Sequence, residues 1–178
     1  VLTLMQDPAQ NIQAAHFYAG MPIMALFDFS SASGVVRINP AAWAFWAHAR
    51  LKGATSLDSQ VCPQGTACVA GYASESAALM ALAGQSNGAQ NIVVTNDTAG
   101  TVTYTLQVNG LSGGTVYATI HTPPAGTRDL PVAGNPLAAD ATALATLISS
   151  VSKDTRSALS LVNGQLQLAL TIPGQSVQ

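Results

Sequence analysis

The sequence predicts a mainly β protein, in which an antiparallel β-sandwich over residues 54–178 follows a helix–strand–helix piece of a β/α barrel over residues 1–53. Two observations lead to this prediction. Stretches within 91–122 and 157–172 alternate apolar and polar residues between turn signals, which is typical of half-exposed antiparallel strands. Residues 21–29 are almost all apolar instead, as in a strand covered on both faces, and a helical pattern follows them.

The apolar strand is expected to lie between two short helices. Each helix begins with a capping residue and a proline, which suits the first helical position because its missing N–H would be unpaired there. Each ends at a glycine, which readily adopts the left-handed conformation at a helix C-terminus. The bounding residues are Asp7, Pro8 and Gly20 for the helix predicted over 8–19, and Asn39, Pro40 and Gly53 for the helix predicted over 40–52, with a loop between the strand and the second helix.

One face of the second helix is expected to carry both tryptophans. The residues spaced i, i+3, i+4 and i+7 on this face are Trp43, Trp46, Ala47 and Arg50. This spacing predicts that the two tryptophans pack in the core; the alternative is a stacking platform for a sugar.

Residues 21–29 need neighbouring strands, because one strand between two helices cannot form a stable sheet. The chain begins at Val1 rather than at methionine, and we expect the neighbours to come from an upstream polypeptide. Only 8% of the residues are charged, against about 25% in an average protein. This low charge suggests that another polypeptide covers much of the surface.

The sandwich is expected to hold about seven or eight strands. Residues 91–96, 101–108 and 115–122 are predicted to form a three-stranded antiparallel meander, with an earlier strand over 77–83.

Two further elements are predicted near the end of the chain. Residues 157–162 and 165–172 flank Asn163-Gly164, a strong signal for a hairpin. A helix is expected after Asn135-Pro136, the alternative being a surface loop. Its apolar stripe consists of Leu137, Ala141, Leu144, Ile148 and Val151.

The two cysteines, Cys62 and Cys68, are predicted to form a local disulfide. Zinc sites need about four ligands, and redox pairs are usually separated by two residues. A disulfide implies an oxidising compartment, so the protein is expected to be secreted or periplasmic. In a eukaryotic secretory pathway the sequence Asn96-Asp97-Thr98 would be a glycosylation sequon, and otherwise it is a turn.

Charge and motifs narrow the possible chemistry. A net charge of −2, with six scattered lysine and arginine residues, makes nucleic acid and membranes poor partners. Residues 84–88, GQSNG, match a nucleophile elbow, with Asp97 and His121 following in hydrolase order. The elbow requires a helix after it, whereas a β pattern follows here, so these residues are predicted to be a hairpin turn. His16, His48 and His121 lack a ligand spacing, so no metal or cofactor is expected, and His121 is expected to be exposed.

One sugar-binding subsite is predicted at the end of the apolar strand. Glu75 is the only glutamate and lies in the sandwich part, so it cannot supply the paired carboxylates of a glycosidase. Asp28 lies near the carboxyl end of the strand, which in a β/α barrel faces the active site. The residues predicted to bind substrate are Asp28, Phe29, Ser30 and Ser31, the alternative being that Asp28 only stabilises the loop.

Four stretches resemble the C-terminal part of retaining clan-A glycoside hydrolases, with the heparanase/β-glucuronidase type and the related β-xylosidase and arabinofuranosidase types the most similar. They are HFYAGMPIMALFDF, RINPAAWAFWAHARLKGA, NIVVTNDTAGTVTYTLQV and LVNGQLQLALTIPGQSVQ. In those enzymes the last barrel strand and its helix lead into a C-terminal sandwich. Their two catalytic glutamates precede the matched part, so the resemblance implies no catalytic residue in this chain.

The resemblance implies the C-terminal portion of a secreted glycosidase whose upstream portion is a separate chain. This chain alone would be inactive; it would complete the barrel, support it and contact the carbohydrate substrate. Two other functions stay open. One is a non-enzymatic extracellular subunit, such as an adhesin, pilus or filament protein. The other is a carbohydrate-binding module, for which Tyr117 is the clear candidate for an exposed aromatic residue.

Overall fold

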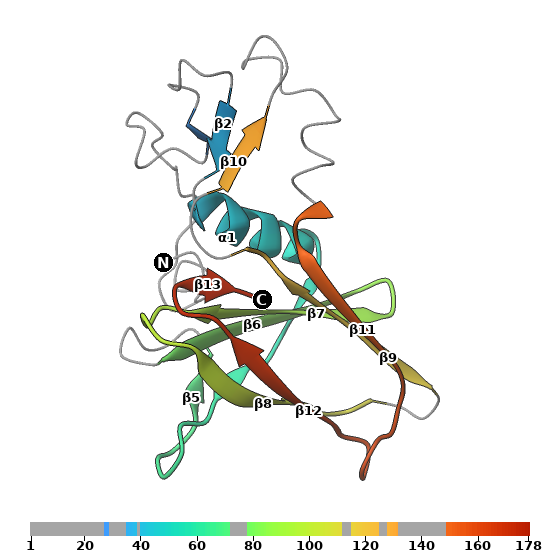
Figure 1. The fold of residues 1–178 in the computed structure, drawn as a ribbon. Helices are drawn as coiled ribbons and strands as arrows, with labels where there is room; N and C mark the ends of the chain where they lie inside the picture. The colour runs from blue at the N-terminus through green and yellow to red at the C-terminus, as the bar shows by residue number, and fades with distance from the viewer. Residues whose placement is uncertain are drawn as a thin grey trace.

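A computed structural model describes residues 27–28, 35–38, 40–71, 78–111, 115–124, 128–131 and 149–178 (Figure 1). Apart from one short helix with a 3-10 turn, the elements in these ranges are mostly strands in antiparallel sheets, which confirms the mainly β, antiparallel fold. No helix in the described ranges is long and apolar enough to cross a membrane.

The largest sheet has four antiparallel strands in the order β13-β7-β6-β3. Their bounds are Thr55–Leu57 for β3, Leu79–Ser86 for β6, Ala89–Asn96 for β7 and Ser176–Val177 for β13. β6 and β7 form a hairpin whose turn residues, Asn87 and Gly88, have φ angles of 50° and 75°. Asparagine and glycine tolerate positive φ, which this type of turn needs at both positions. The turn predicted over 84–88 is therefore confirmed.

Two ribbons of two strands each complete the sandwich (Figure 1). In one, β8 (Val102–Val108) pairs with β12 (Leu166–Ile172), and in the other, β9 (Val116–Thr122) pairs with β11 (Ser152–Leu159). Burial alternates along β8 and β12, as the sequence predicts. The leucine cluster joins the two ribbons; its buried members are Leu166, Leu168 and Leu170, and its half-buried members are Tyr104, Leu106, Val108, Leu111, Val116, Ala118, Ile120, Leu159 and Leu161.

The pairing of these strands differs from the sequence prediction in two places. β7, β8 and β9 follow one another in the chain, but each pairs with other strands, so the predicted meander is wrong. The turn at Asn163-Gly164 forms, with a bridge between Val162 and Gln165, but β11 and β12 then diverge to different partners. Alternation specifies which face of a strand is buried and not which strand lies beside it, and this accounts for both errors.

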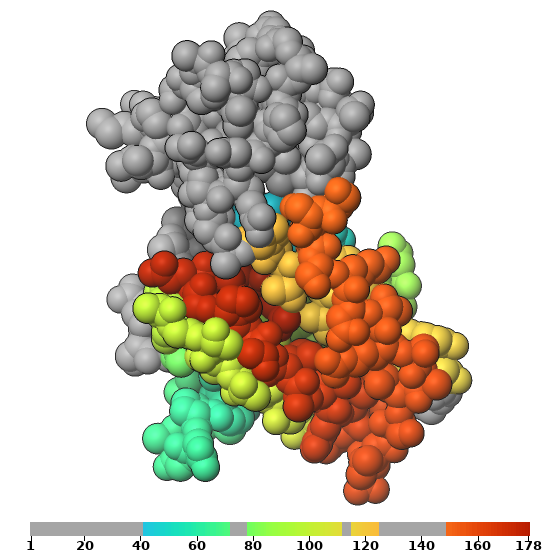
Figure 2. Space-filling model, viewed as in Figure 1, coloured from blue at the N-terminus to red at the C-terminus, as the bar shows by residue number. Residues whose placement is uncertain are grey.

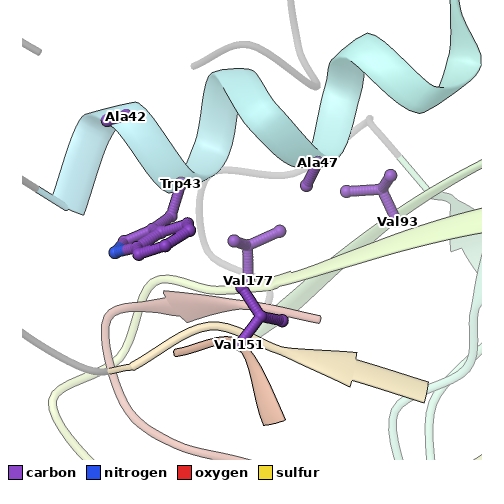
Figure 3. Close-up of a cluster of buried hydrophobic side chains, with 6 residues drawn as sticks. All are labelled: Ala42, Trp43, Ala47, Val93, Val151 and Val177. Carbon is purple, nitrogen blue, oxygen red and sulfur yellow. The ribbon is translucent and has the colours of Figure 1, made fainter. Parts of the chain in front are cut away.

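Helix α1 (Pro40–His48) continues as a 3-10 turn, η3 (Ala49–Leu51), and stops before Gly53, whose φ angle is 74°. This confirms the predicted helix and its glycine end. The face of the helix that carries Trp43 and Ala47 packs against the four-stranded sheet (Figure 3). We call this packing the tryptophan cluster; its buried members are Ala42, Trp43, Ala47, Val93, Val151 and Val177, and its half-buried members are Trp46 and Leu51.

A small antiparallel sheet lies on the other side of α1 from the sandwich strands (Figure 1). Its strands are β1 (Phe27–Asp28), β2 (Val35–Ile38) and β10 (Arg128–Pro131), in the order β1-β2-β10. The sequence analysis expected a loop at β2 and expected β1 to pair with another polypeptide. The loop expectation is wrong, because β2 is a strand, and it supplies one neighbour of β1 from the same chain. Pairing of the other edge of β1 with another polypeptide stays a prediction. β2 has only four residues, and such a short segment shows too little alternation for a strand to be predicted from the sequence.

A disulfide-closed hairpin lies between β3 and β6 in the chain. Its strands are β4 (Gln60–Val61) and β5 (Val69–Ala70), and it projects from the sandwich at the lower left of Figures 1 and 2. Cys62 and Cys68 are bonded, which confirms the predicted disulfide. The helix predicted over 8–19, residues 21–26 of the predicted strand and the helical stripe from Leu137 to Ile148 lie outside the described residues.

Candidate functional site

The structure describes one of the four residues predicted to bind sugar. Asp28 is the last residue of β1, whereas Phe29, Ser30 and Ser31 lie outside the described ranges. The strand register places Asp28 opposite Arg37, and Arg37 opposite Asp129, so these three residues form one row across the small sheet. Sequence reasoning missed this pairing, because the register of strands that are far apart in the chain does not follow from a local pattern.

A second candidate site lies where the end of α1 meets the β9–β11 ribbon. The guanidinium carbon of Arg50 lies 4.1 Å from the ring centroid of Trp46, a cation–π arrangement. The rings of Trp46 and His121 meet edge to face, with centroids 6.0 Å apart. Lys153 on β11 is the register partner of His121 on β9. We call Trp46, Arg50, His121 and Lys153 the cationic junction.

The electrostatics of the cationic junction are dominated by positive charge. Burial, followed by the positive charges of Arg50 and Lys153, lowers the pKa of His121 below its ordinary value. Within the described ranges, the ion pair present joins Arg156 to Asp154 at 2.9 Å, and no carboxylate is paired with Arg50 or Lys153. The junction therefore presents two exposed cations beside a histidine that is neutral at pH 7.

His121 was expected to be exposed, and this prediction is wrong. The residue lies on the threonine side of its strand, but it is half-buried because Trp46 from α1 packs against its ring. Periodicity within one strand cannot reveal a contact that comes from another element.

The two tryptophans pack edge to face, with ring centroids 6.0 Å apart and ring planes at 87°. Trp43 is only 3% exposed, so core packing is confirmed for this residue and its ring is not open to a sugar. Its Nε1 is buried without a hydrogen-bond partner among the described residues and points away from Val177 and Val151 (Figure 3). Trp46 is half-buried, and Arg50 lies over its ring.

His48 lies near the end of α1 and is half-buried. Its Nδ1 is 2.8 Å from the carbonyl oxygen of Ala44, one helical turn earlier. Burial lowers the pKa of His48 below its ordinary value. This local contact agrees with the packing role that the sequence indicates.

The described residues form neither a nucleophile elbow nor a metal site. Ser86 is the last residue of β6, and strand β7 follows it where a nucleophile elbow needs a helix. Within the described part of the chain, no group of three or more His, Cys, Asp or Glu residues could hold a metal ion.

Asn96 has a structural role that the sequence did not reveal. It is 2% exposed, and its Nδ2 donates to the carbonyl oxygens of Gly100 at 2.8 Å and Pro173 at 2.9 Å. Its Oδ1 accepts hydrogen bonds from the backbone N–H and the hydroxyl of Thr98. Asn96 thus ties the β7–β8 turn to the β12–β13 turn, which favours the turn interpretation of the sequon.

Comparisons of the chain with protein-family models, with curated proteins and with solved structures find no match. The functional assignment therefore depends on the residues, their geometry and the resemblance stated above.

Proposed function

We propose that this chain is the C-terminal, non-catalytic portion of a secreted retaining glycoside hydrolase. The observation that carries the proposal is the position of α1. Its tryptophan face packs on the sandwich, while the small sheet lies on the other side of the helix. A helix anchored in this way would hold a neighbouring catalytic part in a fixed position, and it belongs to one of the stretches that resemble the glycosidases.

In this proposal, two carboxylates of the upstream polypeptide hydrolyse the glycosidic bond with retention of configuration. The segment 1–53 completes the barrel, and the sandwich 54–178 supports it. Asp28, with Phe29, Ser30 and Ser31, contributes to the sugar subsite, where a carboxylate can accept hydrogen bonds from sugar hydroxyls. No cofactor is needed, and the Cys62–Cys68 disulfide supports an oxidising, secretory or periplasmic location.

A non-enzymatic extracellular subunit is the second candidate, and one observation favours it. The described end of the apolar strand, β1, pairs antiparallel with β2 of the same chain. A barrel strand would instead have parallel neighbours from the other barrel segments. In this candidate the sandwich would itself be the functional unit, as in an adhesin or a filament.

The native material that contains this sequence provides the test. Intact mass spectrometry and N-terminal sequencing would reveal an upstream polypeptide, and aryl glycosides would detect hydrolysis, with NMR following the anomer first released. We expect retaining activity in the complete material and none in the 178-residue chain alone. A homogeneous preparation of this chain without an upstream partner, inert on all aryl glycosides, would overturn the proposal and favour the second candidate.

The sugar subsite can be tested in the active material by Asp28→Asn. Loss of the charged acceptor should raise the KM for the aryl glycoside about tenfold, since a hydrogen bond to a charged group is worth roughly 1.5–3 kcal/mol. Asp154→Asn is the matched control, because Asp154 lies in the β9–β11 ribbon, on the other side of α1 from the small sheet, and should leave KM unchanged. Equal effects of the two substitutions would contradict the subsite.

A further inference from the structure

We propose that the outer face of the β9–β11 ribbon, together with the cationic junction, binds an acidic saccharide chain, meaning a glycan that bears carboxylate or sulfate groups. The residues of this glycan face are Arg50, Tyr117, Thr119, His121, Lys153 and Thr155. Such binding would be separate from any catalytic site and does not depend on the proposed hydrolysis.

The cationic end of the glycan face is already organised for an anion. Arg50 and Lys153 are exposed, and His121 on β9 lies near both, with its ring against Trp46 of the helix. The guanidinium of Arg50 lies 4.1 Å from the ring of Trp46, so it has less side-chain freedom to lose when it binds a carboxylate or a sulfate. These two cations have no carboxylate partner among the residues that the structure describes, in a chain with only six lysine and arginine residues.

The other end of the glycan face carries an exposed aromatic ring. Tyr117 is 68% exposed, and its ring is therefore available to stack on the apolar face of a sugar. It lies on the same side of β9 as His121, because side chains alternate along a strand, and the four-residue separation corresponds to roughly 13 Å. A surface of this length suits a chain of several sugars better than a single one.

Hydroxyl groups connect the two ends. Thr119 on β9 and Thr155 on β11 are register partners, and both are exposed. Threonine hydroxyls can donate and accept hydrogen bonds, as sugar hydroxyls require. Along this face an aromatic ring, two threonine hydroxyls and two cations follow one another in space. Their order matches the apolar faces, hydroxyls and anionic groups of an acidic glycan.

Other polyanions fit the glycan face less well. Nucleic acid binds through many phosphate contacts, whereas the glycan face offers two exposed cations, Arg50 and Lys153. An acidic peptide could use the cations, but it would have less use for an exposed ring and a row of hydroxyls. A neutral glycan would leave the cations unused.

The proposal is tested by titrating the 178-residue chain at pH 7 and low salt with four polymers. These are polygalacturonate for carboxylate groups, dextran sulfate for sulfate groups, unmodified dextran as the neutral glycan and polyglutamate as the acidic peptide. We expect saturable binding of at least one acidic glycan, and the comparison of the first two polymers identifies the preferred anion. Binding of dextran or polyglutamate as tight as that of the acidic glycans would overturn the proposal, as would no binding of any polymer.

Three single substitutions locate the binding surface. Lys153→Gln should weaken binding of the acidic glycan roughly twofold to fivefold, and Tyr117→Ala about fivefold. Arg156→Gln is the matched control, because it removes the same charge from β11 but lies opposite Ala118, on the other side of the ribbon, and already pairs with Asp154. The control should bind within about twofold of the unmodified chain. Equal losses for Lys153→Gln and Arg156→Gln, with unchanged thermal unfolding, would indicate only long-range attraction and overturn the proposal.

Discussion

The tryptophan cluster and the leucine cluster stabilise the protein in different ways. In the leucine cluster, three leucines of β12 alternate with exposed residues and pack with half-buried residues of β8, β9 and β11. In the tryptophan cluster, a single buried ring, Trp43, fills the space between α1 and the sheet beside small alanine and valine side chains, with Trp46 and Leu51 half-buried at its edge. Apolar contacts are therefore distributed over many similar residues in one cluster and concentrated in one residue in the other.

The two clusters also differ in the buried polar atoms that lie beside them. Trp43 Nε1 and Thr95 Oγ1 are buried without hydrogen-bond partners in the described structure. Thr95 lies opposite Val177, a member of the tryptophan cluster. An unpaired buried polar group costs free energy, so this cluster combines a large apolar contribution with a local penalty. Because the chain's two tryptophans both lie in α1, their fluorescence reports on this cluster alone.

Trp43→Ala should have the largest effect of any substitution in the two clusters. Removing this 3%-exposed ring should lower the free energy of unfolding by about 3–5 kcal/mol, measured by urea denaturation. Trp43→Phe keeps an aromatic ring and removes an N–H that has no partner in the described ranges, so it should cost clearly less. A loss below about 1 kcal/mol for Trp43→Ala would contradict the concentration of contacts in one residue.

Leu168→Ala should have the next largest effect, about 2–4 kcal/mol, because Leu166 and Leu170 remain in place on either side. Leu170→Ala should give a similar loss, as the contacts are distributed. Gln167→Ala is the matched control on the exposed side of β12 and should change stability by no more than about 0.5 kcal/mol. Far-UV circular dichroism in urea measures all three. A loss for Leu168→Ala larger than that for Trp43→Ala would reverse the comparison.

The difference between the clusters also explains what could be predicted from the sequence. The inward faces of β8 and β12 and the tryptophan face of α1 follow from periods of 2 and 3.6 residues, and both predictions are confirmed. The turns at Asn87-Gly88 and Asn163-Gly164 follow from local backbone preferences. The choice of partner strand does not, because many pairings would bury the same faces, and so the predicted meander and terminal hairpin are wrong.

The candidate sites were harder to predict for the same reason. Arg50, His121 and Lys153 are far apart in the sequence and meet only because α1 packs beside the β9–β11 ribbon. The row of Asp28, Arg37 and Asp129 likewise depends on the register of three strands. Sequence patterns identify such residues one at a time, whereas a site is formed by their tertiary arrangement.

Asn96→Ala should have a moderate effect that belongs to neither cluster. It would remove the hydrogen bonds that Asn96 donates to the carbonyl oxygens of Gly100 and Pro173 and accepts from Thr98, at a cost of about 1–3 kcal/mol. Asn109→Ala is a matched control, because Asn109 is exposed and accepts its hydrogen bond from the exposed Gln107 side chain. Urea denaturation of both variants measures the difference. Equal stability of the two variants would show that the turn contacts of Asn96 contribute little.

Acid should weaken the tryptophan cluster before the leucine cluster, and this is the smallest expected effect. Burial and two neighbouring cations, Arg50 and Lys153, lower the pKa of His121 below its ordinary value of 6.5, so the unfolded chain binds this proton more readily than the folded protein. The contribution of neutral His121 to the free energy of unfolding is therefore fully present above pH 6.5, and it is lost as the pH falls from 6.5 toward the lower pKa of the folded state. Burial also lowers the pKa of His48, the last residue of α1, so protonation of this residue should destabilise the folded protein in the same way.

His121→Gln should therefore make the free energy of unfolding, followed by tryptophan fluorescence, depend less steeply on pH between about 7.5 and 5.5. His48→Gln should flatten the same dependence, because burial of His48 lowers its pKa more than the hydrogen bond to the Ala44 carbonyl oxygen raises it. Lys153→Gln keeps His121 and removes one of its cationic neighbours, so it should give an intermediate slope. If His121→Gln and the unmodified protein lose stability in parallel as the pH falls, neither burial nor the neighbouring cations lower the pKa of His121 in the folded protein, and the acid sensitivity has another source, such as His48.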